Sequence, residues 1–140
     1  METILTVDQM RYAEKRSDEL GVSLAQLMDN AGEALGRIVL GYCMKNSKHS
    51  CLILTGKGNN GGDGFVAASF LAAGGVNTTV LLCCGAPNTE LCANAFSKLS
   101  KSVTVTEDTG IGFDSFDVII DCVFGTGFHG QLKDGIKDIF

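Results

Sequence analysis

A glycine-rich segment that follows a short apolar run constrains the fold of this chain more than any other feature of its sequence. Residues 56–64 read GKGNNGGDG, and they separate the apolar run CLILT at 51–55 from the helix-forming run FVAASFLAA at 65–73. A short run that is apolar throughout is typical of a strand buried on both faces of a parallel sheet. The glycine spacing G-x-G-x-x-G is that of a loop that joins such a strand to a helix and approaches phosphate closely. A tight strand-to-helix turn that binds nothing is the alternative.

The other segments continue this alternation of strand and helix. The patterns predict strands at 78–84, 102–106 and 117–124 and an amphipathic helix at 88–101. Two helices precede the first strand, at about 6–21 and 24–44. This order predicts an α/β fold, namely a three-layer α/β/α sandwich with a Rossmann-like, mostly parallel sheet in residues 50–140, preceded by two helices in residues 6–44. Right-handed crossovers are expected to place helices on both faces of the sheet.

Capping residues and apolar spacing define the expected helices. Ser23 and Gln26 form a capping box ahead of the second helix, and Asn88 is the expected N-cap of the last one. The apolar residues from Leu24 to Val39 recur at helical spacing. Their stripe is wide enough for the core and for a contact with a second subunit, and the core is the preferred assignment.

The composition excludes several classes of protein. Hydrophobic residues make up 45% of the chain and charged residues 19%, which is enough apolar material for a core and rules out disorder. The net charge of −5 argues against a nucleic-acid partner, which requires a basic face. No apolar run approaches the length of a membrane span, and the N-terminus lacks the order of a secretory signal.

The six cysteines are expected to be reduced. They lie in apolar or helical runs, where cysteine behaves as a small hydrophobic residue. The sequence has no C-x-x-C pair and only two histidines, so a zinc site is disfavoured. Reduced thiols predict a cytoplasmic protein.

The segment after the second predicted strand disfavours a conventional NAD-dependent oxidoreductase. The dinucleotide-binding fold places an acidic residue there for the ribose hydroxyls. Here the strand runs out as LLCCGAPN at 81–88, and the first acidic residue after it is Glu90.

Polar side chains gather where the first and fourth predicted strands end. Asn59, Asn60 and Asp63 follow the first strand, and Asp121 lies at the end of the fourth. The carboxyl ends of parallel strands meet at one edge of a sheet, where ligands bind. Amide oxygens with a carboxylate suit a weakly hydrated cation or a sugar hydroxyl better than a transition metal. The alternatives are that Asp121 caps a backbone turn and that Asp63 is a first-turn acid favoured by the helix dipole.

Three motifs in this arrangement resemble the YjeF N-terminal domain family. They are LMDNAG at 27–32, GNNGGDG at 58–64 and DCVFGTGFHG at 121–130, and the resemblance covers essentially all 140 residues. The characterised enzymes of that family are NAD(P)H-hydrate epimerases, which interconvert the R and S forms of NADHX and NADPHX, cofactors hydrated at C6 of the nicotinamide ring. The resemblance implies an isomerase of nicotinamide-nucleotide repair. Its S product passes to an NAD(P)HX dehydratase, separate or fused.

The resemblance also implies a set of site residues. Substrate contacts fall on Asn59, Asn60, Gly61, Gly62 and Asp63 and on Gly125, Thr126, Gly127, Phe128, His129, Gly130 and Gln131. One potassium ion per chain is held by Asn60 and Asp121, and a homodimer is expected. The family's catalytic aspartate and a further ion-site serine follow a strand beyond Phe140, so the resemblance implies an incomplete domain with weak unaided activity.

Three alternatives remain open. A YjeF-type domain also serves as a non-catalytic binding or scaffold module, although the intact NNGGD segment and Asp121 favour the enzyme. His129 is either a general base or, with Lys57 and Lys133, a source of positive charge for phosphate, and the second is preferred. Asn30 either reaches the substrate pocket or lies on an exposed helix face.

Overall fold

A computed structural model describes Tyr12 and residues 23–123 of the chain. In chain order its elements are α2 (Leu24–Lys45), β1 (Ser50–Thr55), α3 (Asn59–Ala73), β2 (Asn77–Leu82), α4 (Glu90–Ser97), β3 (Thr104–Thr106), the 3-10 turn η1 (Phe113–Ser115) and β4 (Val118–Cys122). Apart from Tyr12, the helix predicted at about 6–21 lies outside the described residues, as does the glycine-rich loop predicted at 125–131. Within the described part of the chain, no helix has the length and apolar character needed to cross a membrane.

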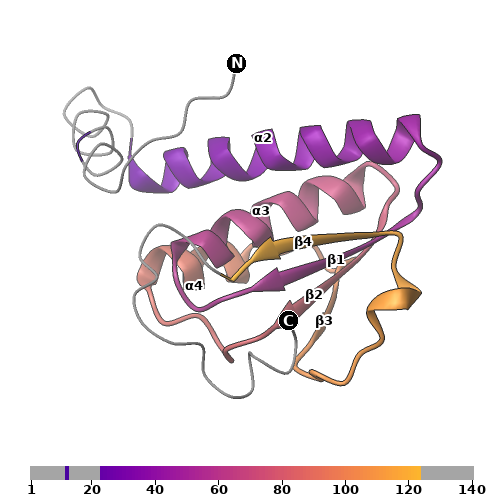
Figure 1. The fold of residues 1–140 in the computed structure, drawn as a ribbon. Helices are drawn as coiled ribbons and strands as arrows, with labels where there is room; N and C mark the ends of the chain where they lie inside the picture. Colours follow the sequence, from indigo (N-terminus) through magenta and orange to yellow (C-terminus); the bar gives the residue numbers. More distant parts are fainter. Residues whose placement is uncertain (1–11, 13–22, 124–140) are drawn as a thin grey trace.

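The sheet has four parallel strands in the order β3-β2-β1-β4. At its centre, Ile53 of β1 is in register with Val80 of β2 and Ile120 of β4. The chain steps from β1 through β2 to β3 in one direction and then returns across the sheet to β4 (Figure 1). The prediction of an α/β fold with a parallel sheet is confirmed. The reversal between β1 and β4 creates a topological switch point, where open α/β sheets bind ligands.

The helices α2, α3 and α4 lie on one side of the sheet (Figure 1). The crossovers from β1 to β2 and from β2 to β3 run in the same direction, so a common right-handed sense places α3 and α4 on the same face. The rings of Phe65 on α3 and Phe96 on α4 meet edge to face, with centroids 5.1 Å apart. The second predicted helix, α2, packs on α3 as an outer layer.

The opposite face of the sheet was expected to carry a second layer of helices, but in the described residues the connection between β3 and β4 covers it. The side chains that meet there are Leu52, Leu54 and Leu81 from the strands and Ile111, Phe113 and Phe116 from the connection between β3 and β4. This connection, orange in Figure 1, includes Gly110 and Gly112 and forms only the single turn η1. Because it is short and interrupted by glycine, it covers the sheet as an irregular segment, and no α-helix covers this face within the described residues.

Hydroxyl side chains mark the starts of two helices. Ser23 Oγ accepts a hydrogen bond from the backbone N–H of Gln26 at 3.1 Å, which confirms the predicted start of α2. The N-cap of α4 is Thr89 and not Asn88 as predicted, because Thr89 Oγ1 accepts from the N–H of Cys92 at 3.1 Å.

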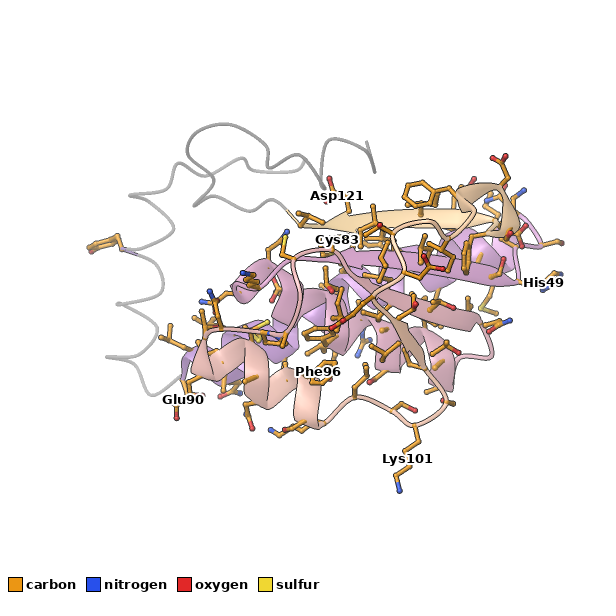
Figure 2. All side chains as sticks on the ribbon, turned by 90° about the horizontal axis from the view of Figure 1, so that it is seen from below. His49, Cys83, Glu90, Phe96, Lys101 and Asp121 are labelled. Carbon is orange, nitrogen blue, oxygen red and sulfur yellow. The ribbon has the colours of Figure 1, made fainter. Side chains whose placement is uncertain are left out.

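Asp117 joins the amino ends of β1 and β4. Its Oδ2 accepts hydrogen bonds from the backbone N–H of His49 at 2.8 Å and of Ser50 at 3.3 Å, and its own N–H donates to Ser50 Oγ at 3.0 Å. The backbone hydrogen bonds that the Asp117 carboxylate accepts, first from His49 and then from Ser50, lower the pKa of Asp117. Figure 2 shows His49 at the end of the sheet opposite Asp121, so His49 is an exposed residue remote from the switch point.

Candidate functional site

Backbone contacts hold the carboxyl ends of β1 and β4 together. Gly56, directly after β1, donates its N–H to the carbonyl of Cys122 at 3.1 Å. A side chain has no room there, because a Cβ on Gly56 would lie 2.7 Å from the carbonyl oxygen of Val123. The chain therefore leaves β1 and β4 side by side at the switch point.

The polar part of the glycine-rich segment is helical and not a loop as predicted. The helix α3 begins at Asn59, so residues 60–63 lie in its first turns. Its N-cap is Gly58, which has no side chain to accept a capping hydrogen bond, whereas Ser23 and Thr89 cap α2 and α4. A helix start without a side-chain cap suits an anionic ligand, because the backbone N–H groups and the helix dipole favour negative charge.

Two glycines allow α3 to start against its neighbours. A Cβ on Gly61 would fall on the carbonyl oxygen of Gly56, and one on Gly62 would lie 2.5 Å from Met28 Sδ. Met28 therefore brings the motif LMDNAG of α2 against the start of α3. Asn30 of the same motif is exposed, which agrees with the exposed-face alternative.

The turn between β2 and α4 forms a further wall beside the start of α3. Thr89 Oγ1 donates a hydrogen bond to Asn59 Oδ1 at 3.0 Å while it caps α4. The N–H of Asn88 donates to the carbonyl of Lys57 at 3.2 Å. The Asn59 side chain, predicted to contact substrate, thus has a structural partner. This wall was not predicted from the sequence, and the hydroxyl N-cap Thr89 is the signal that locates it.

Two carboxylates lie near the buried thiol of Cys122 at the same edge. Burial raises the pKa of Cys122 to about 12, and Asp63 and Asp121 act in the same direction. Asp121 is exposed, and its Oδ1 accepts a hydrogen bond from the N–H of Val123 at 2.9 Å, so it does cap a backbone turn. Asp63 lies past the first turn of α3, so it is not the first-turn acid of the alternative.

The structure brings the first predicted group of site residues to one edge of the sheet. Asn60 lies at the start of α3. Asp121 is the last residue but one of β4 and is in register with Leu54, the last residue but one of β1. The elements that carry Asn60 and Asp121 therefore meet at the switch point.

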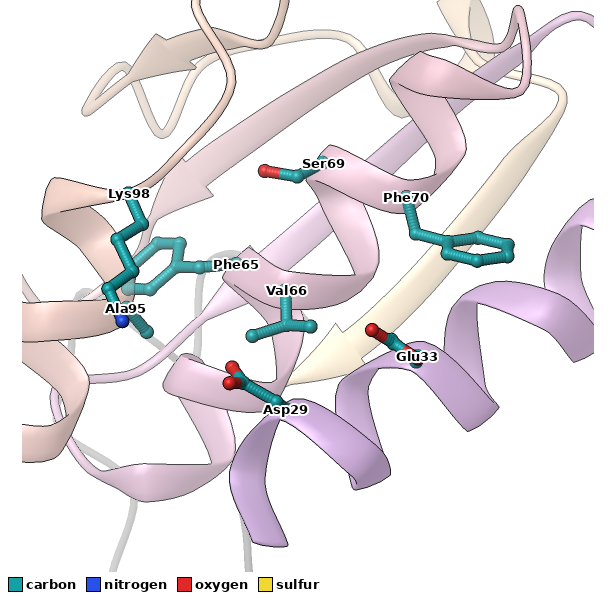
Figure 3. A pocket seen from close by; sticks show the side chains of 8 residues that line it. All are labelled: Asp29, Glu33, Phe65, Val66, Ser69, Phe70, Ala95 and Lys98. Atoms are coloured by element: carbon teal, nitrogen blue, oxygen red, sulfur yellow. The ribbon is translucent and has the colours of Figure 1, made fainter. Parts of the chain in front are cut away.

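A separate hollow of about 300 Å³ lies between α2, α3 and α4 (Figure 3). Its lining residues are Asp29, Glu33, Phe65, Val66, Ser69, Phe70, Ala95 and Lys98. None of the site residues predicted from the sequence and described by the structure lines it. The candidate site is therefore the sheet edge and not this hollow.

Known proteins are similar to the chain along most of its length. Residues 24–140 match the family described as YjeF-related protein N-terminus. The chain is 35% identical over 136 residues to an NAD(P)H-hydrate epimerase of Nitrosopumilus maritimus, and the aligned region covers 93% of this chain and 63% of that protein. It is 32% identical over 145 residues to a bifunctional NAD(P)H-hydrate repair enzyme Nnr of Methanopyrus kandleri, and the aligned region covers 95% of this chain and 28% of that protein.

A solved structure shares the fold. The crystal structure of the yeast protein ynu0, YNL200c, superimposes with a TM-score of 0.78 at 24% identity and covers 99% of this chain and 63% of that one. The chain therefore spans less than two thirds of the length of each of these three proteins.

Proposed function

The chain belongs to the YjeF-related protein N-terminus family, and from this premise we propose that it is an NAD(P)H-hydrate epimerase. The observation that carries the proposal is the start of α3, which has no side-chain cap and lies at the switch point between β1 and β4. Asn60, Asp63 and Asp121 add polar groups at the same edge. The similarity to a protein named NAD(P)H-hydrate epimerase supplies the reaction.

In this reaction the R and S forms of NADHX and NADPHX interconvert at C6 of the nicotinamide ring. The start of α3 binds the phosphates of the dinucleotide, because its N–H groups and dipole attract negative charge. Gly61 and Gly62 let α3 start against Gly56 and Met28, which fixes the helix start at this edge, and Asn60 and Asp63 orient the substrate. Holding the ring in one orientation lowers the barrier by fixing the reacting geometry in advance.

The residues at this edge also fit a potassium ion, which we include in the proposal. The donors are the side-chain amide oxygen of Asn60 and the exposed carboxylate of Asp121. No group of three or more His, Cys, Asp and Glu side chains is placed to hold a metal ion among the residues that the structure describes. One carboxylate with amide oxygens suits a weakly held monovalent ion. When bound, the ion supplies positive charge toward the substrate's phosphates.

Substitution of Asp121 with asparagine should raise the potassium concentration that supports half-maximal epimerisation by about tenfold or more. Asparagine keeps the Oδ1 acceptor for the N–H of Val123 but removes the charge, and a contact with a charged group contributes about 1.5–3 kcal/mol. The measurement is R-to-S conversion by the complete protein during a potassium titration, with an S-specific dehydratase as the reporter.

Asp114→Asn is the matched control, because Asp114 is an exposed acid in η1, ahead of the amino end of β4. Equal potassium dependence in the two variants would contradict the ion site. A wild-type protein that binds the substrate but does not epimerise it would contradict the enzyme and favour a non-catalytic binding module.

The proposal extends to the place of the reaction in the cell. The S product passes to an NAD(P)HX dehydratase, and the relative from Methanopyrus kandleri is named as a bifunctional repair enzyme. We place the protein in the cytoplasm because all six cysteines are free thiols.

An exposed apolar face of α2 supports a homodimer. The residues of this face recur at spacings of three and four and are Leu24, Leu27, Ala31, Ala34, Ile38 and Gly41. Ile38 is 69% exposed, and Tyr42 one turn later is 51% exposed. A spacing of three and four is that of a helix–helix contact, and a two-fold axis would bury the same face on both copies.

Substitution of Ile38 with glutamate should raise the dimer dissociation constant by at least about tenfold, because an unpaired charge buried in an apolar contact costs several kcal/mol. Analytical ultracentrifugation over a range of concentrations measures the constant. Met44→Glu is the control, since Met44 is 75% exposed and lies on the polar side of α2. A wild-type protein that stays monomeric, or equal weakening in both variants, would exclude this face as the dimer contact.

A further inference from the structure

Two adjacent cysteines stand at the carboxyl end of β2. The strand ends at Leu82, so Cys83 and Cys84 lie in the turn that follows, ahead of Gly85 with its positive φ of 82°. This corrects the predicted strand, which ran to Cys84. Both residues are partly exposed, whereas the other four cysteines, Cys43, Cys51, Cys92 and Cys122, are buried. Cys83 and Cys84 are thus the two cysteines with partial access to solvent.

The Cys83 thiol is held in place at the site edge. Its backbone N–H donates to the carbonyl of Thr55 at 3.0 Å, and its Sγ lies 3.7 Å from the carbonyl oxygen of Leu81 as a weak donor. Burial, then the neighbouring thiol of Cys84, and less strongly the carboxylate of Asp121 raise the pKa of Cys83 to about 11. Figure 2 shows Cys83 and Asp121 near the same end of the sheet. The pair therefore borders the candidate site.

The geometry of adjacent residues selects the kind of ligand. Consecutive Cα atoms are about 3.8 Å apart across a trans peptide, whereas a disulfide usually requires about 4.4–6.8 Å. A direct disulfide between Cys83 and Cys84 is therefore strained. When one atom is inserted between the two sulfurs and is bonded to both, the sulfurs lie farther apart than in a direct S–S bond. The strain is therefore relieved.

We propose that Cys83 and Cys84 form a dithiol site for trivalent arsenicals, in which one arsenic atom bridges the two sulfurs. An organoarsenic oxide RAs=O condenses with both thiols. Two As–S bonds form, the As=O bond breaks, and the oxygen leaves as water with the two thiol protons. Arsenic remains trivalent, so no oxidant or reductant is required. The bridged product stands beside Asp121 and obstructs the edge at which the substrate is proposed to bind.

The experiment treats the complete, folded protein with one equivalent of phenylarsine oxide. Intact mass spectrometry is expected to find one phenylarsenic group per chain, with loss of one water. Ellman's reagent without denaturant is expected to count two fewer reactive thiols after treatment than before it. Cys83→Ser and Cys84→Ser should each weaken retention against excess monothiol by about 10²-fold or more, because the second bond no longer forms within one molecule.

Cys92→Ala is the matched control and should retain arsenic as the wild type does, since Cys92 is buried in α4. Retention that persists in both serine variants, or that peptide mapping assigns to Cys43 and Cys51, would overturn the proposal. The dithiol 2,3-dimercaptopropanol should release the arsenic.

A second readout rests on the proposed function. One equivalent of phenylarsine oxide should abolish epimerisation, and 2,3-dimercaptopropanol should restore it. Full activity of a protein shown by mass to be bridged at Cys83 and Cys84 would overturn the obstruction of the site. If the untreated protein has no epimerase activity, the proposed function fails, and the dithiol site is then decided by the mass measurement alone.

Discussion

Substitution of Gly61 with alanine should lower the free energy of unfolding by about 1–3 kcal/mol or more and should eliminate substrate binding. A Cβ on this residue would fall on the carbonyl oxygen of Gly56 and lie 3.1 Å from its carbonyl carbon. Both neighbours are backbone atoms, so no side-chain rotation relieves the contact. Either α3 tilts away from β1, or Gly56 loses its hydrogen bond to the carbonyl of Cys122. Each movement displaces the helix start that is proposed to bind phosphate.

Urea denaturation followed by circular dichroism measures the loss of stability, and isothermal titration with NADHX measures binding. Gly58→Ala is the matched control in the same segment, because nothing lies within 4 Å of a Cβ at Gly58. As a change at the N-cap, it should cost less than about 1 kcal/mol. Equal losses of stability in the two variants would show that the contact between Gly61 and Gly56 does not limit the packing of α3.

The strands and the edge at which the site lies could be predicted from local pattern. CLILT at 51–55 is apolar throughout because β1 lies in the middle of the sheet and is covered on both faces. Alternation of strand and helix implied parallel strands, and parallel strands bring their carboxyl ends to one edge. Asn60 and Asp121 could therefore be expected at the same edge, where the structure places the elements that carry them.

The start of α3 could not be predicted from local propensity. Asparagine, glycine and aspartate disfavour a helix interior, so residues 59–63 were expected to form a loop. They are helical because Gly61 and Gly62 pack against Gly56 and Met28, and these contacts belong to the tertiary structure. The two glycines that lower helix propensity are thus the residues that allow the helix to start there.

The remaining parts of the site depend on register and chain crossing. Cys83 and Thr89 border the edge only because β2 ends at Leu82 and its following turn lies beside the start of α3. No spacing between these residues and the glycine-rich segment indicates this neighbourhood. A second layer of helices was likewise expected from the handedness of crossovers. Within residues 23–123 the connection between β3 and β4 covers that face without an α-helix, because handedness fixes only the face on which a connection lies and not whether it is helical.

Substitution of Gly32 with alanine should destabilise the protein by about 1–3 kcal/mol or more, whereas the same change at Gly41 should stabilise it by about 0.5–1 kcal/mol. Both glycines lie in α2, so both gain helix propensity from alanine. Gly32 faces α3, where a Cβ would fall on Val66 Cβ and lie 2.8 Å from the carbonyl oxygen of Asp63. Around Gly41, nothing lies within 4 Å of a Cβ.

Thermal and urea unfolding of the two variants test whether Gly32→Ala lowers stability and Gly41→Ala raises it. Relief of the contact at Gly32 requires α2 to move off α3, because Val66 Cβ and the Asp63 carbonyl are fixed by the α3 backbone. That movement also withdraws Met28 from Gly62, so Gly32→Ala should weaken substrate binding in addition to stability. Stabilisation by both substitutions would mean that α2 is not closely packed on α3. Destabilisation confined to Gly32→Ala, with weaker binding, would show that the LMDNAG motif acts on the site through the packing of α2 against α3.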